Sequence, residues 1–128
     1  MGIDACLPSP NPGEVLVWRV ELGVDAAALA ALESGLDDEE RARAARFAVP
    51  AARRRFVVAR AALRQLLGHY TGTRAGALRF VAGARGKPAL AGESALRFNV
   101  AHSGDFALIA LARGREVGVD IEATPRDI

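Results

Sequence analysis

The sequence predicts a small α+β protein in which helices pack on an antiparallel sheet. Three observations carry this prediction. The 128 residues fit one domain, apolar residues recur at helical spacing in the first half of the chain, and short apolar runs separated by turns fill the second half. The composition agrees, because 51% hydrophobic and 25% charged residues are the balance of a folded protein and exclude a disordered one.

The first residues of the chain are expected to lie outside the core. Residues 1–13 are rich in Pro and Gly and predict an extended tail, so the folded lobe is expected over 14–128. Residues 14–22 alternate in character and predict a strand. Asp25 then suits the N-cap of a short helix of Ala and Leu that ends near Gly35.

Two further helices are predicted on either side of Pro50. Asp37 can cap the first and form a capping box with Glu40, and Pro50 is expected to end it and to begin the next. The second is expected over 51–67, with its end at Gly68. A buried stripe is predicted at Phe56, Ala59, Leu63 and Leu67. The arginines are expected on solvated faces; these are Arg41, Arg43, Arg46, Arg53, Arg54, Arg55, Arg60 and Arg64.

Short strands dominate the rest of the chain. They are predicted over 78–82, 96–100, 106–112 and 116–122. The tight connection Arg113-Gly114-Arg115 indicates that the last two of these strands form a hairpin.

The sequence also bounds the class of protein. No apolar run approaches the roughly 20 residues needed to cross a bilayer, and no signal peptide is visible. Cys6 is the only cysteine, so an internal disulfide and a cysteine-built zinc site are excluded. We therefore expect a cytoplasmic protein. The net charge of +2 and the pI of about 9.3 permit phosphate-bearing partners without naming one.

Two carboxylates near the end of the chain form the sharpest local pattern. On a strand over 118–122, Asp120 and Glu122 would share one face, because side chains alternate. Two like charges at this spacing repel unless a cation lies between them, and Mg²⁺ prefers such oxygen ligands. A solvent-facing hairpin edge is the alternative.

A second pattern is the polar turn within 98–105, which holds His102, Ser103 and Asp105 between two apolar strands. A nucleophile–base pair is not expected, because such residues come from distant segments and no Gly-x-Ser-x-Gly elbow is present. Backbone N–H groups and the imidazole could instead hold a phosphate. A strand connection with a surface histidine is the alternative.

The third pattern is a Gly-Lys-Pro turn that contains Lys87, the only lysine. Pro88 favours extended geometry at Lys87, which directs the Lys87 side chain, and its ammonium group could then meet a phosphate. The glycine spacing of a P-loop is missing. The arginines leave a nucleic-acid-binding protein open as an alternative, although no aromatic residues are interleaved with them and no known module is legible.

Taken in order, these pieces resemble a 4'-phosphopantetheinyl transferase of the surfactin-synthetase-activating (Sfp-like) type. The resemblance covers about residues 37–124 and rests on the Arg-rich helix pair, Gly86-Lys87-Pro88, the stretch 98–104 and the stretch 118–122. It implies two similar α+β lobes with coenzyme A and Mg²⁺ between them. The implied activity moves the phosphopantetheine arm of coenzyme A onto a serine of an acyl or peptidyl carrier protein.

The resemblance also implies roles for particular residues. Asp120 and Glu122 would hold Mg²⁺ and serve catalysis. The residues implied for coenzyme A binding are Arg43, Arg55, Lys87, Pro88, His102 and Thr124. Two departures are visible: Ala101 stands where the family usually has Ser, and no Trp-x-x-Lys-Glu motif of a second lobe follows before Ile128.

From these departures we expect the N-terminal lobe alone. Such a lobe would self-associate through an exposed apolar face, and a non-catalytic lobe that needs a partner is the alternative function. No membrane or nucleic-acid partner is expected. The sequence does not distinguish carrier proteins of fatty-acid, polyketide and nonribosomal peptide synthesis.

Overall fold

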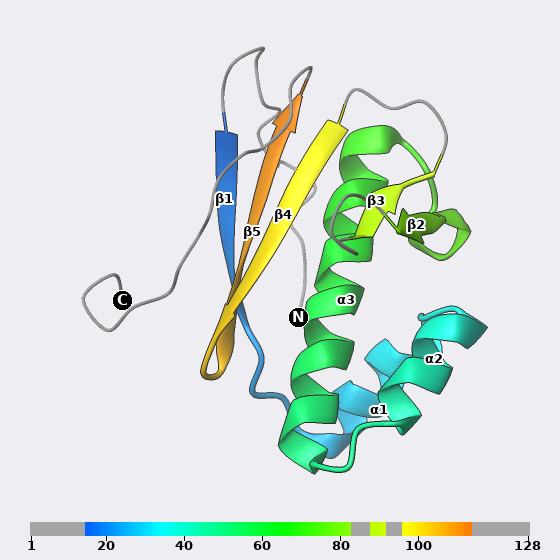
Figure 1. Ribbon diagram of the computed structural model, residues 1–128, viewed down its shortest axis with the longest axis vertical. Helices are drawn as coiled ribbons and strands as arrows, with labels where there is room; N and C mark the ends of the chain where they lie inside the picture. Colours follow the sequence, from blue (N-terminus) through cyan, green and yellow to red (C-terminus); the bar gives the residue numbers. More distant parts are fainter. Residues whose placement is uncertain (1–14, 83–87, 92–95, 114–128) are drawn as a thin grey trace.

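The computed structural model of the chain describes residues 15–82, 88–91 and 96–113. A three-stranded antiparallel sheet in the order β1-β5-β4 packs against the long helix α3, and the short helices α1 and α2 lie beside the N-terminal half of α3 (Figure 1). The sheet strands are β1 (Val15–Glu21), β4 (Leu96–Ser103) and β5 (Phe106–Arg113). The predicted α+β class, with helices on an antiparallel sheet, is confirmed.

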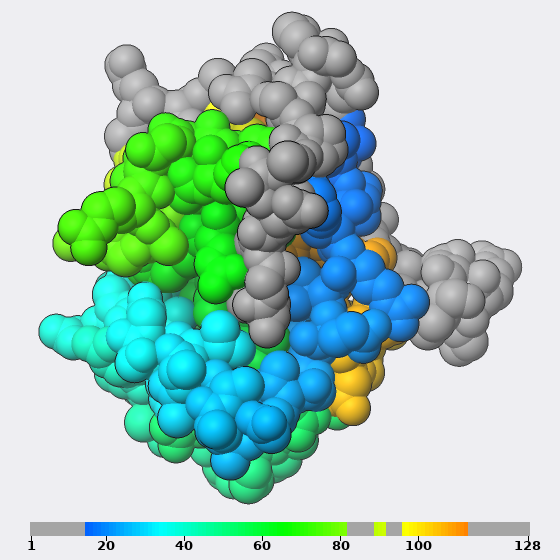
Figure 2. All heavy atoms as spheres, turned by 180° about the vertical axis from the view of Figure 1, so that it is seen from behind, coloured from blue at the N-terminus to red at the C-terminus, as the bar shows by residue number. Residues whose placement is uncertain are grey.

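Both short helices begin at the predicted caps. Helix α1 (Ala26–Ser34) begins after Asp25, whose carboxylate accepts a hydrogen bond from the Ala28 N–H at 2.8 Å. Helix α2 (Asp38–Ala45) begins with a capping box, in which Asp37 and Glu40 each accept a hydrogen bond from the other's backbone N–H. Seen from behind, these two helices cover one end of the molecule (Figure 2).

The prediction that Pro50 ends the helix that begins after Asp37 is wrong. Helix α2 ends at Ala45, and Pro50 is the first residue of α3. Val49, between them, has φ −97° and ψ 120°, the extended conformation that a following proline imposes. The helix before Pro50 therefore cannot continue through Val49 to the proline.

Helix α3 (Pro50–Thr71) also runs past the predicted end at Gly68. A Cβ atom at Gly68 would lie 2.7 Å from the Thr73 carbonyl oxygen, so this glycine permits a close approach of the backbone inside the helix. The end falls at Gly72, whose φ of 70° is left-handed and therefore suits glycine. The sequence shows two glycines four residues apart, and only the tertiary contact separates their roles.

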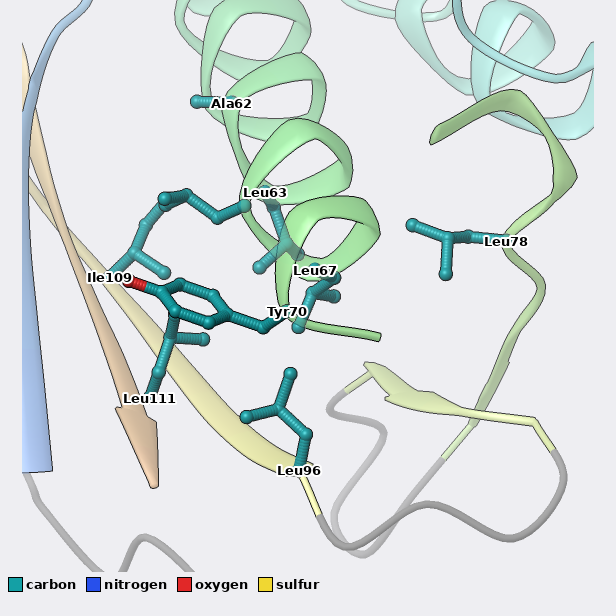
Figure 3. Packing of buried hydrophobic residues seen from close by; sticks show 9 residues of the cluster. Ala62, Leu63, Leu67, Tyr70, Leu78, Leu96, Ile109 and Leu111 are labelled. Carbon is teal, nitrogen blue, oxygen red and sulfur yellow. The ribbon is translucent and has the colours of Figure 1, made fainter. Parts of the chain in front are cut away.

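The core lies between α3 and one face of the sheet. Leu63, Leu67 and Tyr70 of α3 face Ile109 and Leu111 of β5 (Figure 3). The predicted helix stripe is buried at Ala59, Leu63 and Leu67, while Phe56 is partly buried. Of the helices that the structure describes, none combines the length and the apolar character that a membrane-spanning segment needs.

The hairpin that the structure describes joins β4 and β5. Its two-residue connection, Gly104-Asp105, contains a left-handed glycine with φ 56°. The neighbouring strand β2 (Phe80–Ala82) is shorter than predicted because a 3-10 turn, η1 (Ala75–Ala77), precedes it. It pairs with β3 (Pro88–Leu90), a strand that the sequence did not predict. The predicted tail over 1–13 and the predicted hairpin with 116–122 lie outside the described residues.

Candidate functional site

One face of α3 carries Phe56, Arg60 and Arg64 at steps of four residues. The expectation that both of these arginines are solvated is wrong, since Arg64 is 2% exposed and the Arg60 side chain 13%. Both guanidinium groups form ion pairs with Glu40, which lies in the acidic first turn of α2. This face of α3 is therefore the junction of the two helices.

Arg64 is held entirely by the protein. Its Nε donates to Glu40 Oε1 at 2.7 Å and its Nη2 to Asp37 Oδ2 at 2.9 Å. Its Nη1 donates to the carbonyl oxygens of Ala75 at 2.8 Å and Leu78 at 3.0 Å. These four bonds use four of the five N–H groups, as a buried charge requires, and at 2% exposure Arg64 is out of reach of a ligand.

Glu40 is the carboxylate that joins the helices. Besides Arg64, it accepts a hydrogen bond from the Asp37 backbone N–H at 3.1 Å, and its second oxygen accepts from Arg60 Nη1 at 3.0 Å. The sequence identified Glu40 only as part of a capping box. Its second role required knowing that Arg60 and Arg64 face the start of α2, which spacing within one helix does not reveal.

Arginine and phenylalanine side chains alternate along this junction. The Arg60 Cζ lies 5.2 Å from the ring centroids of both Phe56 and Phe80. Arg43 Cζ lies 4.9 Å from the Phe56 centroid, and Arg64 Cζ lies 5.1 Å from the Phe80 centroid. Such contacts stabilise a cation by the negative face of the ring. We call Arg43, Phe56, Arg60, Phe80 and Arg64 the arginine–aromatic stack.

Arg55, expected at the coenzyme A site, lies on another side of α3 and contacts the β4–β5 turn. Its Nε donates to Asp105 Oδ1 at 3.1 Å, and Arg54 Nη2 donates to the same oxygen at 2.8 Å. The Arg55 hydrogen bond is the first cause that holds the pKa of the Asp105 carboxyl below its usual range, and Arg54 adds to it. Arg55 keeps its terminal nitrogens without a partner among the described residues, so a phosphate could still reach it.

The turn that carries Asp105 is also tied to the end of β1. The Leu22 N–H donates to the Asp105 carbonyl oxygen at 2.8 Å, and Arg54 Nε donates to the Leu22 carbonyl oxygen at 3.2 Å. The N-terminal turns of α3, the end of β1 and the β4–β5 turn are thereby fixed to one another. No local pattern predicts these pairs, since Asp105 lies about fifty residues beyond the two arginines.

His102 lies in β4 and not in the turn, which corrects the expectation. It pairs with Ala107 of β5 and shares the helix-facing side of β4 with Phe98 and Val100, because side chains alternate. His102 is exposed, yet packing around the imidazole and, second, the charge of Arg60 lower its pKa below the usual value. The imidazole is therefore neutral at pH 7 and can donate one hydrogen bond and accept another.

The structure describes four of the predicted site residues and places them on different elements. Arg43 and Arg60 contact the same Phe56 ring, the charge of Arg60 acts on the pKa of His102, and Arg55 faces the β4–β5 turn. Pro88 belongs to β3, where its backbone is paired with Ala82. Lys87, Asp120, Glu122 and Thr124 lie outside the described residues. Among the residues that the structure does describe, no three His, Cys, Asp or Glu side chains gather closely enough to hold a metal ion.

The fold and this cation-bearing face define an α+β lobe of the kind that the sequence resembles. Residues 25–113 match the family profile described as 4'-phosphopantetheinyl transferase, N-terminal. The match covers more than half of the chain. The chain therefore belongs to the 4'-phosphopantetheinyl transferase family.

Two curated relatives agree with this assignment. The 4'-phosphopantetheinyl transferase HetI from Nostoc sp. is 42% identical over 112 residues, which is 85% of this chain and 47% of HetI. The protein slr0495 from Synechocystis sp., provisionally named for the same activity, is 40% identical over 89 residues, which is 68% of this chain and 36% of that protein. The chain spans about half the length of HetI and a smaller share of slr0495.

Proposed function

We propose that this chain provides the coenzyme A-binding half of a Mg²⁺-dependent 4'-phosphopantetheinyl transferase. The reaction would move the phosphopantetheine arm of coenzyme A to a serine of an acyl or peptidyl carrier protein. Family membership supports the reaction type. The observation that carries the binding role is Arg43, an exposed cation that stacks on Phe56 and has no carboxylate partner among the described residues.

The contrast with the neighbouring arginines supports a role for Arg43 in binding phosphate. Six of the eight arginines on α2 and α3 pair with carboxylates, whereas Arg43 and Arg46 make no ion pair within the described part of the chain. A guanidinium with open N–H groups matches two phosphate oxygens at once. Arg55, through its terminal nitrogens, and the neutral His102 imidazole would add contacts to the same ligand.

This pattern of pairing also weighs against a nucleic-acid-binding protein. Such a protein needs several open cations along one surface to neutralise successive backbone phosphates. Most arginines on the two helices already face a carboxylate. A small ligand with a few phosphates suits the remaining capacity better than a long polyanion does.

The metal is proposed from donor chemistry alone. Asp120 and Glu122 offer carboxylate oxygens, the ligands that Mg²⁺ prefers, and the predicted strand would place both on one face. When bound, the ion would neutralise negative charge on the pyrophosphate of coenzyme A. Lys87, Pro88 and Thr124 belong to the same proposal as residues that line the coenzyme A site.

Calorimetry of coenzyme A binding, with and without Mg²⁺, tests the proposal. We expect each ligand to tighten the binding of the other, and Asp120→Ala to remove that coupling. Asp38→Ala is a matched control, because Asp38 is an exposed carboxylate whose one ion pair in the described part of the chain is with Arg41. Equal affinity for coenzyme A with and without Mg²⁺ would contradict the metal site. Transfer is read separately, as the gain of one phosphopantetheine arm in the mass of an apo carrier protein.

A further inference from the structure

Arg43 differs from the other helix arginines in what holds it. The paired arginines spend N–H groups on carboxylate oxygens, as Arg60 does on Glu40. Arg43 instead rests with its Cζ 4.9 Å from the centroid of the Phe56 ring. A ring face attracts the flat side of the guanidinium and leaves the N–H edge open.

The Phe56 ring is itself fixed on several sides. It packs against the buried cluster that contains Leu36 and Ala44, and its centroid lies 5.6 Å from that of Phe47. Arg60 contacts the same ring at 5.2 Å and is held in turn by Glu40. Phe56 is therefore a rigid support for Arg43, fixed by both α2 and α3.

We propose that Phe56 is a positioning residue that holds the guanidinium edge of Arg43 toward the 3'-phosphate of coenzyme A. This inference rests on the proposed function. A free arginine side chain loses much rotational freedom when it binds a ligand, and a support that removes this freedom beforehand increases affinity. Phe56 would act only through Arg43, without touching the ligand itself.

The sheet offers a matched control for this contact. Arg19 Cζ lies 4.5 Å from the centroid of the Phe106 ring, which is the same kind of stack in a different place. Arg19 also pairs with Glu21 at 3.3 Å, so it lacks the open character of Arg43. Phe106→Leu removes a cation–ring contact of equal type without touching the stack on α3.

The experiment compares the dissociation constants of coenzyme A and 3'-dephospho-coenzyme A, measured by calorimetry on the full chain. The dissociation constant of 3'-dephospho-coenzyme A divided by that of coenzyme A measures what the 3'-phosphate contributes to binding. Phe56→Leu is expected to lower this ratio by about two- to fivefold, the size of an exposed cation–ring contact. Phe56→Tyr should restore it, and Phe106→Leu should leave it at the wild-type value. Without ligand, the NMR signal of the Arg43 Nε–H group should lose its ring-current shift in Phe56→Leu only.

The outcomes separate this inference from the proposed function. If wild type prefers coenzyme A and Phe56→Leu keeps the full preference, the inference is overturned while the function stands. If wild type binds both ligands equally, the proposed phosphate contact fails and the inference fails with it. If Phe56→Leu does not fold, Arg43→Lys decides, because it keeps the charge and loses the flat stacked group. An unchanged ratio in Arg43→Lys overturns the inference.

Discussion

Arg64 and the neighbouring pair Arg54 and Arg55 of α3 look alike in the sequence and differ in the structure. Arg64 is buried, and four protein oxygens occupy its guanidinium. Arg54 and Arg55 share one exposed carboxylate, that of Asp105, at the edge of the sheet. The difference teaches that charge alone does not mark a binding residue in this family member. A buried arginine bonded to protein oxygens builds the fold, and only an exposed arginine with open N–H groups can meet a ligand.

The largest effect is expected from Arg64→Met. Its loss leaves Glu40 and Asp37 near each other without their shared cation, and breaking a buried pair in this way costs about 3–5 kcal/mol. Urea unfolding measures the change. Arg53→Met is the matched control, because its pair with Glu33 lies at the surface and is worth at most about 1 kcal/mol. Equal losses in the two variants would contradict the structural role of Arg64.

A smaller loss of stability is expected from Glu40→Gln. The amide keeps the shape of the side chain but leaves Arg64 with Asp37 alone and Arg60 without a carboxylate partner among the described residues. A lost hydrogen bond to a charged group is worth about 1.5–3 kcal/mol. Urea unfolding again gives the free energy. Stability equal to that of wild type would show that Glu40 does not join the helices.

Asp105→Asn should have a weaker effect than either change, because its ion pairs are exposed. Arg55 and Arg54 lower the pKa of Asp105 in the folded state. The stability it contributes is therefore present above the unfolded pKa of about 4 and disappears as pH falls through the lower folded value. Unfolding followed against pH should give a wild-type advantage at pH 7 that vanishes in acid. An advantage that is constant down to the acid limit would contradict this assignment.

The smallest effect concerns His102. Packing around the imidazole and, second, the Arg60 charge lower its pKa, so Arg60→Met should raise the pKa toward the usual value. In wild type the same shift makes stability fall as pH drops below about 6.5, since the unfolded state binds the proton first. NMR titration of the imidazole measures the change. A pKa that stays the same in Arg60→Met would separate His102 from the stack.

Local patterns predicted much of the fold and less of the site. The caps at Asp25 and Asp37 follow from short-range hydrogen bonds, which a sequence displays directly. The end of α3 was misplaced because the role of Gly68 depends on Thr73, which folds back against it. The extended residue before Pro50 follows from the proline itself, whereas the end of the preceding helix at Ala45, five residues earlier, has no marker in the sequence.

The site was harder to predict because it depends on contacts between distant segments. The spacing of Phe56, Arg60 and Arg64 indicates one helix face, but nothing in that spacing says which element covers it. Asp105 is fifty residues from Arg55, and no local pattern connects them. The family resemblance pointed to Arg43, Arg55 and His102, and the structure adds what holds each of them in place.

The claim that an open arginine held on an aromatic ring binds the ligand is tested most directly by two neighbouring arginines, of which only one rests on a ring. Arg43 and Arg46 are both exposed, and neither has an ion pair among the described residues. Arg43 stacks on Phe56, and Arg46 does not. Coenzyme A affinity, measured by calorimetry on Arg43→Met and Arg46→Met, should fall about tenfold or more in the first and stay at the wild-type value in the second. The unfolding free energy should fall by at most about 1 kcal/mol in Arg43→Met, the worth of its exposed ring contact, and stay at the wild-type value in Arg46→Met. Equal affinities in wild type and both variants would contradict the account.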